Sequence, residues 1–163
     1  FIQADAASRR GLIQVLGVTQ TFRQLMTCLR TYIGLCIYSK DLPPAEITDR
    51  LGIEASREVT RDPTSKKRGV REHNLWVWST RGLMESTDHI EHFRRLFALL
   101  EGKDDALGEL RKLGCSMEVS CYWDSDGQGG PWLDLATIDA LSRFRLEPWW
   151  DIYFVRDESS GDA

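Results

Sequence analysis

The sequence has no long apolar run and no excess of positive charge. No stretch approaches the roughly 20 apolar residues that a membrane-spanning helix needs. The 25 Asp and Glu residues outnumber the 21 Lys and Arg residues, which gives a formal net charge of −4. A basic loop from Arg57 to Arg71 has no helix or aromatic residues to present its charges, and we interpret it as a solvated loop. We therefore expect no membrane protein and consider nucleic acid an improbable partner.

Cysteine is also scarce, with four residues in a chain of 163. Cys28 and Cys36 fall within one predicted strand, and Cys115 and Cys121 fall within another. At about 3.3 Å per residue, the members of each pair are roughly 20 Å or more apart, which is too far for a disulfide. None of the spacings is that of a CxxC metal or redox motif. We expect four free thiols, mostly buried, and a cytoplasmic protein.

Motifs for nucleotides and for nucleophilic catalysis are lacking as well. The glycines form neither a P-loop nor a dinucleotide fingerprint, and no Ser or Cys lies in a nucleophile motif. The run from Asp124 to Gly129 imitates the start of a calcium loop, but its twelfth position is Leu135, where a bidentate Glu is needed. Glu85, His89 and His92 have a spacing that metal ligands use, yet a solvated helix face is the interpretation we favour. The sequence predicts no cofactor and no metal.

What the chain does have is the length and composition of one globular domain. It is 42% hydrophobic and 28% charged, as is common for folded proteins, and it is long enough to bury a core. We predict a single α+β domain over residues 27–155. Residues 1–26 form an N-terminal segment that is predicted to be helical in part, and residues 156–163 are predicted to be a disordered tail.

Strand and helix patterns follow one another along this domain. Strands are expected over Cys28 to Tyr38, Arg57 to Arg61, Asn74 to Thr80, Cys115 to Trp123 and Arg145 to Phe154. Helices are expected over Pro44 to Leu51, Thr87 to Leu100, Asp105 to Leu113 and Asp134 to Phe144. With the central helix pair counted as one, the first six elements follow the ferredoxin-like βαββαβ order. We predict a mainly antiparallel sheet of about five strands with helices on one face.

Three runs of the sequence resemble a known bacterial family. The run from Tyr38 to Glu54, YSKDLPPAEITDRLGIE, follows the first strand, and the run from Leu75 to Thr80, LWVWST, precedes an amphipathic helix. The third run is Asp151 to Tyr153, which closes the last strand. Over roughly residues 30–154 the chain resembles the family called "domain of unknown function 4279". The resemblance implies a compact bacterial domain, and it implies no catalytic residue, because the family name assigns no activity.

The last predicted strand raises the question of function. Alternate side chains of a strand point to opposite faces, so Trp150 and Ile152 share one face while Trp149 and Asp151 share the other. If helices cover the first face, the second face collects aromatic and acidic side chains, and Trp78 and Trp149 are expected to be more exposed than Trp150. The predicted binding residues are Tyr32, Tyr38, Trp76, Trp78, Glu118, Tyr122, Trp149, Asp151 and Tyr153.

Three interpretations of this aromatic face are open. Residues 1–26 or a long loop could cover it, it could bind a protein partner or a second copy, or it could form a catalytic cleft. In the catalytic case, Glu118 and Asp151 would be a paired acid and base. We favour a non-enzymatic domain for protein–protein binding or self-association. A role in defence or toxin immunity is consistent with a small, acidic bacterial binding domain, and the alternative is an enzyme that uses the same face.

Overall fold

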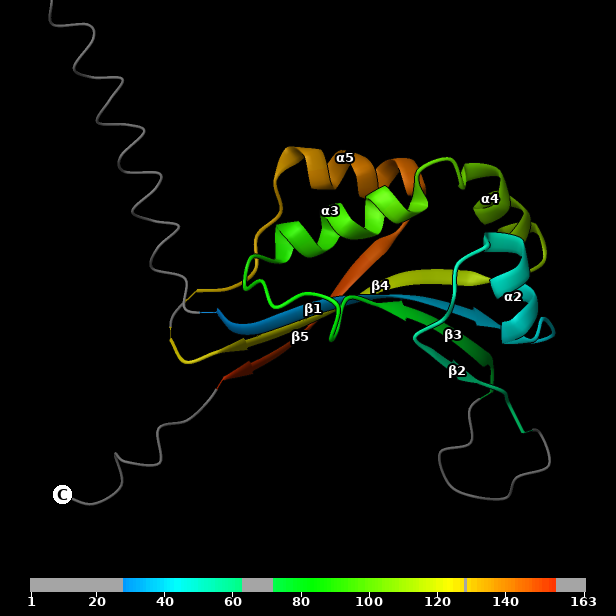
Figure 1. Cartoon of the computed structure of the whole chain (residues 1–163), viewed down its shortest axis with the longest axis horizontal. Helices are drawn as coiled ribbons and strands as arrows, with labels where there is room; N and C mark the ends of the chain where they lie inside the picture. The colour runs from blue at the N-terminus through cyan, green and yellow to red at the C-terminus, as the bar shows by residue number, and fades with distance from the viewer. Residues whose placement is uncertain (1–27, 63–71, 128, 155–163) are drawn as a thin grey trace, which may run out of the picture.

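The computed structural model describes residues 28–62, 72–127 and 129–154 as a sheet of five strands with four helices on one side (Figure 1). The strands are β1 (Cys28–Ser39), β2 (Arg57–Val59), β3 (Asn74–Ser79), β4 (Ser116–Ser125) and β5 (Glu147–Phe154). The helices are α2 (Pro44–Leu51), α3 (His89–Leu100), α4 (Asp104–Lys112) and α5 (Leu135–Phe144). The predicted α+β class and the predicted order of elements are confirmed.

Three predictions concern residues outside the described ranges. They are the partly helical segment at residues 1–26, most of the basic loop and the tail at residues 156–163. Within the described ranges, no helix is long and apolar enough to cross a membrane.

The long strand β1 lies at the centre of the sheet. The strand order is β2-β3-β1-β4-β5, and β1 is antiparallel to both of its neighbours, β3 and β4. The edge strand β2 is antiparallel to β3, whereas the other edge strand, β5, is parallel to β4. Parallel neighbours need a crossover connection, which α5 supplies. The sheet is therefore mixed but mostly antiparallel, and its likeness to ferredoxin-like domains stays a prediction.

Local sequence signals explain where the helices begin and end. Pro44 opens α2, where a missing N–H costs nothing, and Gly52 ends it with a φ of 61° that an L side chain rarely adopts. Asp88 caps α3 by accepting a hydrogen bond from the Ile90 N–H at 3.0 Å. Asp134 caps α5 in the same manner. The predicted helices therefore lie within one or two residues of the observed ones.

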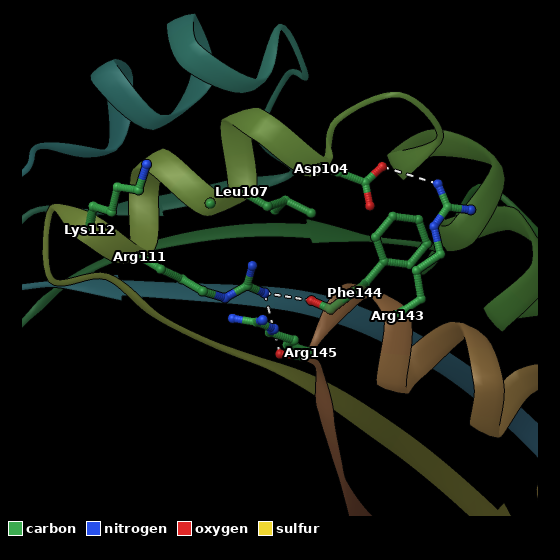
Figure 2. Close-up of a pocket in the computed structure, with 8 residues that line it drawn as sticks. Asp104, Leu107, Arg111, Lys112, Arg143, Phe144 and Arg145 are labelled. Carbon is green, nitrogen blue, oxygen red and sulfur yellow. Dashed lines mark hydrogen bonds and ion pairs between the residues drawn. The ribbon is translucent and has the colours of Figure 1, made fainter.

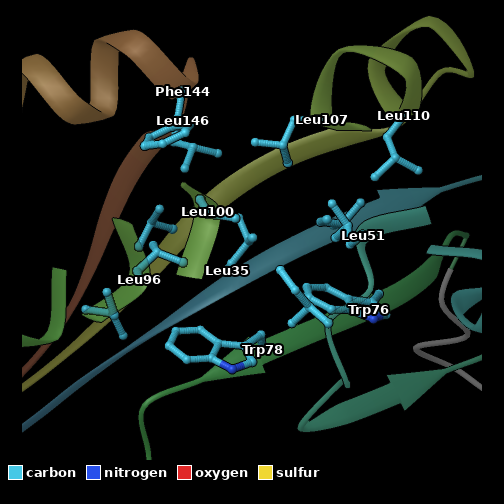
Figure 3. Packing of buried hydrophobic residues seen from close by; sticks show 14 of the residues in the cluster. Leu35, Leu51, Trp76, Trp78, Leu96, Leu100, Leu107, Leu110, Phe144 and Leu146 are labelled. Carbon is cyan, nitrogen blue, oxygen red and sulfur yellow. The ribbon is translucent and has the colours of Figure 1, made fainter. Parts of the chain in front are cut away.

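The hydrophobic core lies between the helices and the sheet. Ile33, Leu35 and Ile37 of β1 have no exposed surface, and leucines from α2, α3 and α4 pack against this face. Figure 3 shows Leu51, Leu107 and other core leucines directed at the sheet from the helix layer. Burying a side chain of this size contributes roughly 1.5–3 kcal/mol relative to leaving it exposed. The helices are therefore held on the sheet mainly by aliphatic packing from one side.

Both tryptophans of β3 lie in this core, so their predicted place on the opposite face was wrong. In the strand pairing, Trp76 stands opposite Ile37 and Trp78 stands opposite Leu35, so the indoles share the face of those aliphatic residues. Trp76 is 0% exposed and Trp78 is 6% exposed. The Nε1–H of Trp76 donates to Oγ1 of Thr48 in α2 at 2.9 Å, which satisfies its buried polar atom.

The residues that alternate with these tryptophans face away from the helices. Leu75 and Val77 were predicted to be the inward pair, but the observed register turns them to the other side of the sheet. All four side chains are apolar, so alternation alone could not decide which pair points inward. The larger indoles point inward, and one of them reaches α2.

All four cysteines, Cys28, Cys36, Cys115 and Cys121, are free thiols, as predicted. Three of them are buried and Cys28 is half-buried. Burial raises the pKa of the Cys121 thiol well above its ordinary value. A thiol that stays protonated in an apolar environment behaves as a small hydrophobic side chain.

Candidate binding face

The candidate site is the face of the sheet that points away from the four helices, which we call the open face. Figure 1 shows all four helices on the opposite side of the sheet. No helix among the described residues covers the open face. Its side chains come from alternate positions of the strands, because successive side chains of a strand point to opposite faces of the sheet.

A stack of three tyrosine rings crosses the open face. Tyr32 of β1 stands opposite Tyr122 of β4, and their rings stack with centroids 4.6 Å apart and an interplanar angle of 4°. Tyr153 of β5 continues the stack, with its ring centroid 5.2 Å from that of Tyr122. Stacked aromatic pairs contribute about 0.5–1.5 kcal/mol beyond their burial. The tyrosine stack therefore forms an ordered aromatic surface across three strands.

Two arginines lie on this stack, and neither was among the predicted site residues. The guanidinium carbon of Arg30 is 5.0 Å from the Tyr122 ring centroid, and that of Arg81 is 5.2 Å from the Tyr32 ring centroid. Both distances are within the range of cation–π interactions. Arg30 also donates to the Tyr122 hydroxyl oxygen at 2.8 Å and pairs with Asp124 at 3.5 Å. The cations and the rings are thus arranged before any partner binds.

The edge strand β5 adds the most exposed aromatic side chains of this face. Trp149 is 42% exposed and Tyr153 is 49% exposed, whereas Trp150 is partly buried against the core. The expectation that Trp149 is more exposed than Trp150 is confirmed, and the same expectation for Trp78 was wrong. Tyr153 donates to Asp151 at 3.2 Å, and the Asp151 charge raises the pKa of the Tyr153 phenol.

The structure does not bring the predicted acid and base together. Both Glu118 and Asp151 lie on the open face, but Glu118 stands opposite Glu147 while Asp151 stands opposite Tyr122. Glu118 and Tyr122, which is the partner of Asp151, are four positions apart on β4, or roughly 13 Å at 3.3 Å per residue. A shared proton requires carboxylates within hydrogen-bond distance. This arrangement removes the acid/base pair on which the enzyme hypothesis depended.

Glu118 instead has a partner at the other end of the face. The hydroxyl of Tyr38 donates to Oε1 of Glu118 at 2.7 Å, and burial together with this carboxylate raises the pKa of the Tyr38 phenol. A cavity of about 260 Å³ lies beside this pair, lined by Tyr38, Glu72, His73 and Leu75. Tyr38 and Glu118 are therefore on the predicted face but away from the tyrosine stack.

The prediction of a solvated face for His89 and His92 was also wrong. The ring of His89 is buried among aromatic residues, with centroids 5.3 Å from Trp123, 5.5 Å from Trp150 and 6.0 Å from Trp132. Its Nε2 accepts a hydrogen bond from the Trp132 N–H at 3.2 Å and also contacts that residue's carbonyl oxygen. Burial lowers the pKa of His89. This histidine joins the start of α3 to the segment that precedes α5.

His92 is fully buried one turn further along α3. Its Nδ1 is 2.7 Å from Oγ1 of Thr80, and its Nε2 is 2.8 Å from the Ser86 carbonyl oxygen. Both ring nitrogens are therefore engaged by the loop that leads into the helix. Among the described residues, no group of three His, Cys, Asp or Glu side chains is placed to hold a metal ion.

These features define the class of the protein as an α+β domain whose mixed sheet has one helix-covered face and one face with a tyrosine stack. The chain belongs to the family described as "Domain of unknown function (DUF4279)", whose model matches residues 30–155. The resemblance found in the sequence is thereby confirmed, and a bacterial origin stays a prediction. Comparison with curated proteins and with solved structures gave no match.

Proposed function

We propose that this protein is a non-enzymatic binding domain that docks a protein surface on its open face. The observation that supports this proposal is the tyrosine stack and its continuation into the exposed Trp149. Tyr, Trp and Arg are enriched in protein interfaces, and the two aromatic types bury a large area with few rotatable bonds. A stack that is ordered in advance also lowers the entropy lost on binding.

The charges on the open face favour a protein over a nucleic acid. The two stacked arginines, Arg30 and Arg81, are balanced by Asp124 and Asp151 on the same face. Nucleic acids select surfaces with excess positive charge, whereas protein interfaces use both signs to set orientation. The overall charge of −4 also favours a protein partner over a nucleic acid.

A second copy of the chain is the partner that this charge arrangement fits best. The register sets Tyr32 and Tyr122 side by side with Asp151 beyond them on β5, and Arg81 lies over the far side of Tyr32. Two copies related by a two-fold axis parallel to the strands would place Tyr32 on Tyr122, and Arg81 on Asp151. Such a self-complementary patch is what a two-fold interface requires.

We also propose that the domain acts in the bacterial cytoplasm. Four free thiols support a reducing compartment. A role in defence against a toxin would make the toxin, in place of a second copy, the protein on the open face.

Sedimentation velocity of the full chain over a wide concentration range tests the proposal. We expect a concentration-dependent dimer for the wild type and at least tenfold weaker association for Trp149→Ala/Tyr153→Ala. The matched control is Leu113→Ala/Leu135→Ala, which removes two exposed apolar side chains, 48% and 79% exposed, from outside the open face. This control should dimerise like the wild type.

Two results would overturn the proposal. A wild type that is monomeric at all concentrations would refute the second copy as the partner. A monomer in which Trp149→Ala/Tyr153→Ala lowers the free energy of unfolding by several kcal/mol would mean that another part of the chain covers the face, because loss of exposed side chains usually costs less than about 0.5 kcal/mol each.

A further inference from the structure

A cavity on the helix side of the molecule is separate from the open face. It has a volume of about 490 Å³ and lies between α4 and the C-terminal end of α5 (Figure 2). Cavities of this size hold small molecules in other proteins. Its lining residues are Asp104, Leu107, Gly108, Arg111, Lys112, Arg143, Phe144 and Arg145.

The lining is strongly basic, although the protein as a whole is acidic. Four of the lining side chains are cationic and one is a carboxylate, whereas the whole chain carries a net charge of −4. Arg143 is paired, because it donates to Asp104 at 3.0 Å and to Glu101 at 3.2 Å. None of the other three cations, Arg111, Lys112 and Arg145, forms an ion pair with an acid among the described residues.

Two of these cations lie next to one another. The guanidinium of Arg111 donates to the carbonyl oxygens of Phe144 at 2.5 Å and of Arg145 at 3.3 Å, which holds it at the end of α5. Figure 2 shows the Arg145 guanidinium beside it. Burial and the Arg145 charge lower the pKa of Arg111. Two like charges at close range repel, and an anion between the two guanidinium groups would turn this repulsion into attraction for the anion.

The helix ends account for only part of this positive charge. The cavity is lined by α4 from its first residue, Asp104, to its last, Lys112, and by the last turn of α5, and each helix C-terminus carries about half a negative charge. The two C-terminal ends offset about one of the positive charges, the N-terminus of α4 adds about half a positive charge, and Asp104 offsets another one. The lining therefore keeps an excess of at least roughly two positive charges, although Arg111 also caps α5 through the Phe144 and Arg145 carbonyl oxygens.

The backbone around the cavity gives a second, independent observation. Gly108 lies inside α4, where glycine destabilises a helix relative to alanine, and a Cβ at this position would meet nothing within 4 Å. No neighbouring atom therefore requires a glycine, but any side chain there would project into the space that Gly108 lines. Arg145 adopts a φ of 52°, a conformation that usually selects glycine or asparagine. The chain thus has glycine inside a helix that lines the cavity and arginine at a turn that favours glycine.

We propose that this cavity binds a small molecule through its phosphate group, with Arg111, Lys112 and Arg145 as the cationic contacts. Guanidinium groups match phosphate oxygens with paired hydrogen bonds, and lysine adds a point charge. Leu107 and Phe144 are the apolar side chains that line the cavity beside them. The site is independent of the proposed docking of a protein on the open face.

Titration of the full chain with inorganic phosphate and with phenyl phosphate, followed by amide chemical shifts at constant ionic strength, tests this proposal. Both probes should bind saturably with shifts centred on α4 and α5, and phenyl phosphate should bind at least as tightly as phosphate. Lys112→Gln/Arg145→Gln should weaken binding at least tenfold. The control Lys40→Gln/Arg95→Gln removes two exposed positive charges outside the cavity lining and should change the affinity less than twofold.

A third variant tests the space inside the cavity separately from the charge of its lining. Gly108→Leu fills the space without changing any charge and should also weaken binding at least tenfold, while leucine suits a helix. The proposal would be overturned by shifts that do not saturate, or by equal losses of affinity in the two charge variants. It would also be overturned by unchanged phosphate binding in Gly108→Leu, or by much weaker binding of phenyl phosphate than of phosphate. Thermal unfolding of each variant without phosphate verifies that it is folded.

Discussion

The two faces of the sheet are both rich in aromatic residues, yet they are built for different environments. The covered face combines aliphatic side chains of β1 with the indoles of Trp76 and Trp78, and the indole N–H of Trp76 donates to Thr48 within the core. The open face combines tyrosines with arginines, whose hydroxyl and guanidinium groups reach the surface. Aromatic content alone does not identify a core. To distinguish a core from an exposed face, it is more informative to ask whether each ring carries a polar group that can stay in water.

The largest difference between the faces should appear in the stability of tryptophan variants. Trp76→Ala should lower the free energy of unfolding by about 3–5 kcal/mol, because it leaves a cavity in the core and removes the partner of Thr48. Trp149→Ala, on the open face, should cost less than about 0.5 kcal/mol. Urea denaturation of both variants measures the contrast. Similar losses at the two positions would show that the faces are equally covered.

The next largest effect should be a pH dependence of the free energy of unfolding that arises from His89 on the covered side of the sheet. Burial lowers the pKa of His89 in the folded state below its ordinary value of 6.5, so the unfolded chain binds a proton more readily. The stability that depends on neutral His89 is complete above pH 6.5 and is lost as the pH falls from 6.5 towards the folded-state pKa. The slope is at most about 1.4 kcal/mol per pH unit for one proton.

Urea denaturation of the wild type and of His89→Gln at pH 7.5, 6.0 and 5.0 measures this effect. Because carboxylates also titrate in this range, the difference between the two proteins isolates the contribution of His89. That difference should shrink as the pH falls. A constant difference would mean that His89 can be protonated without leaving its site among Trp123, Trp132 and Trp150.

The tyrosine stack should make a smaller contribution to stability. Tyr122→Leu keeps an apolar side chain but removes both ring contacts and the hydroxyl that Arg30 binds, so we expect a loss of about 1 kcal/mol. Tyr153→Leu removes only one end of the stack and should cost less. Urea midpoints compare the two variants. A larger loss for Tyr153 would place the centre of the stack at the sheet edge.

The smallest effect concerns the titration of one phenol on the open face. The Asp151 charge and its hydrogen bond raise the pKa of Tyr153, so Asp151→Asn should move this pKa down towards 10.0, the ordinary value for tyrosine. A carbon-13 titration of the tyrosine ring resonances measures the change. An unaltered pKa in the variant would mean that Tyr153 is influenced mainly by its ring neighbours.

Much of the fold follows from local patterns in the sequence. Asp88 and Gly52 indicate helix ends because capping depends on only a few neighbouring residues. The two faces of β1 are predictable because large aliphatic residues alternate with other types there. For β3, both sets of alternating residues are apolar, and only the register with β1 decides that Trp76 faces the helices.

The parts of the site that could not be predicted depend on contacts between distant segments. His89 is buried by Trp132, which lies 43 positions further along the chain, and no local sequence pattern predicts that contact. Glu118 and Asp151 are on the predicted face, but their separation depends on the parallel register of β4 and β5. Arg81 follows the end of β3, where strand alternation no longer indicates a direction. The basic cavity forms only when α4 and α5 meet.

The central position of β1 has a consequence for synthesis on the ribosome. Its partner β4 comes much later in the chain, since Ile33 pairs with Cys121, which is 121 − 33 = 88 residues further on. At roughly 5–20 residues per second, translation needs about 4–18 s to supply that partner. During this time the most apolar strand of the nascent chain lacks its longest neighbour, and such a segment is prone to associate with other chains. We therefore expect a chaperone that protects exposed apolar segments to raise the folding yield.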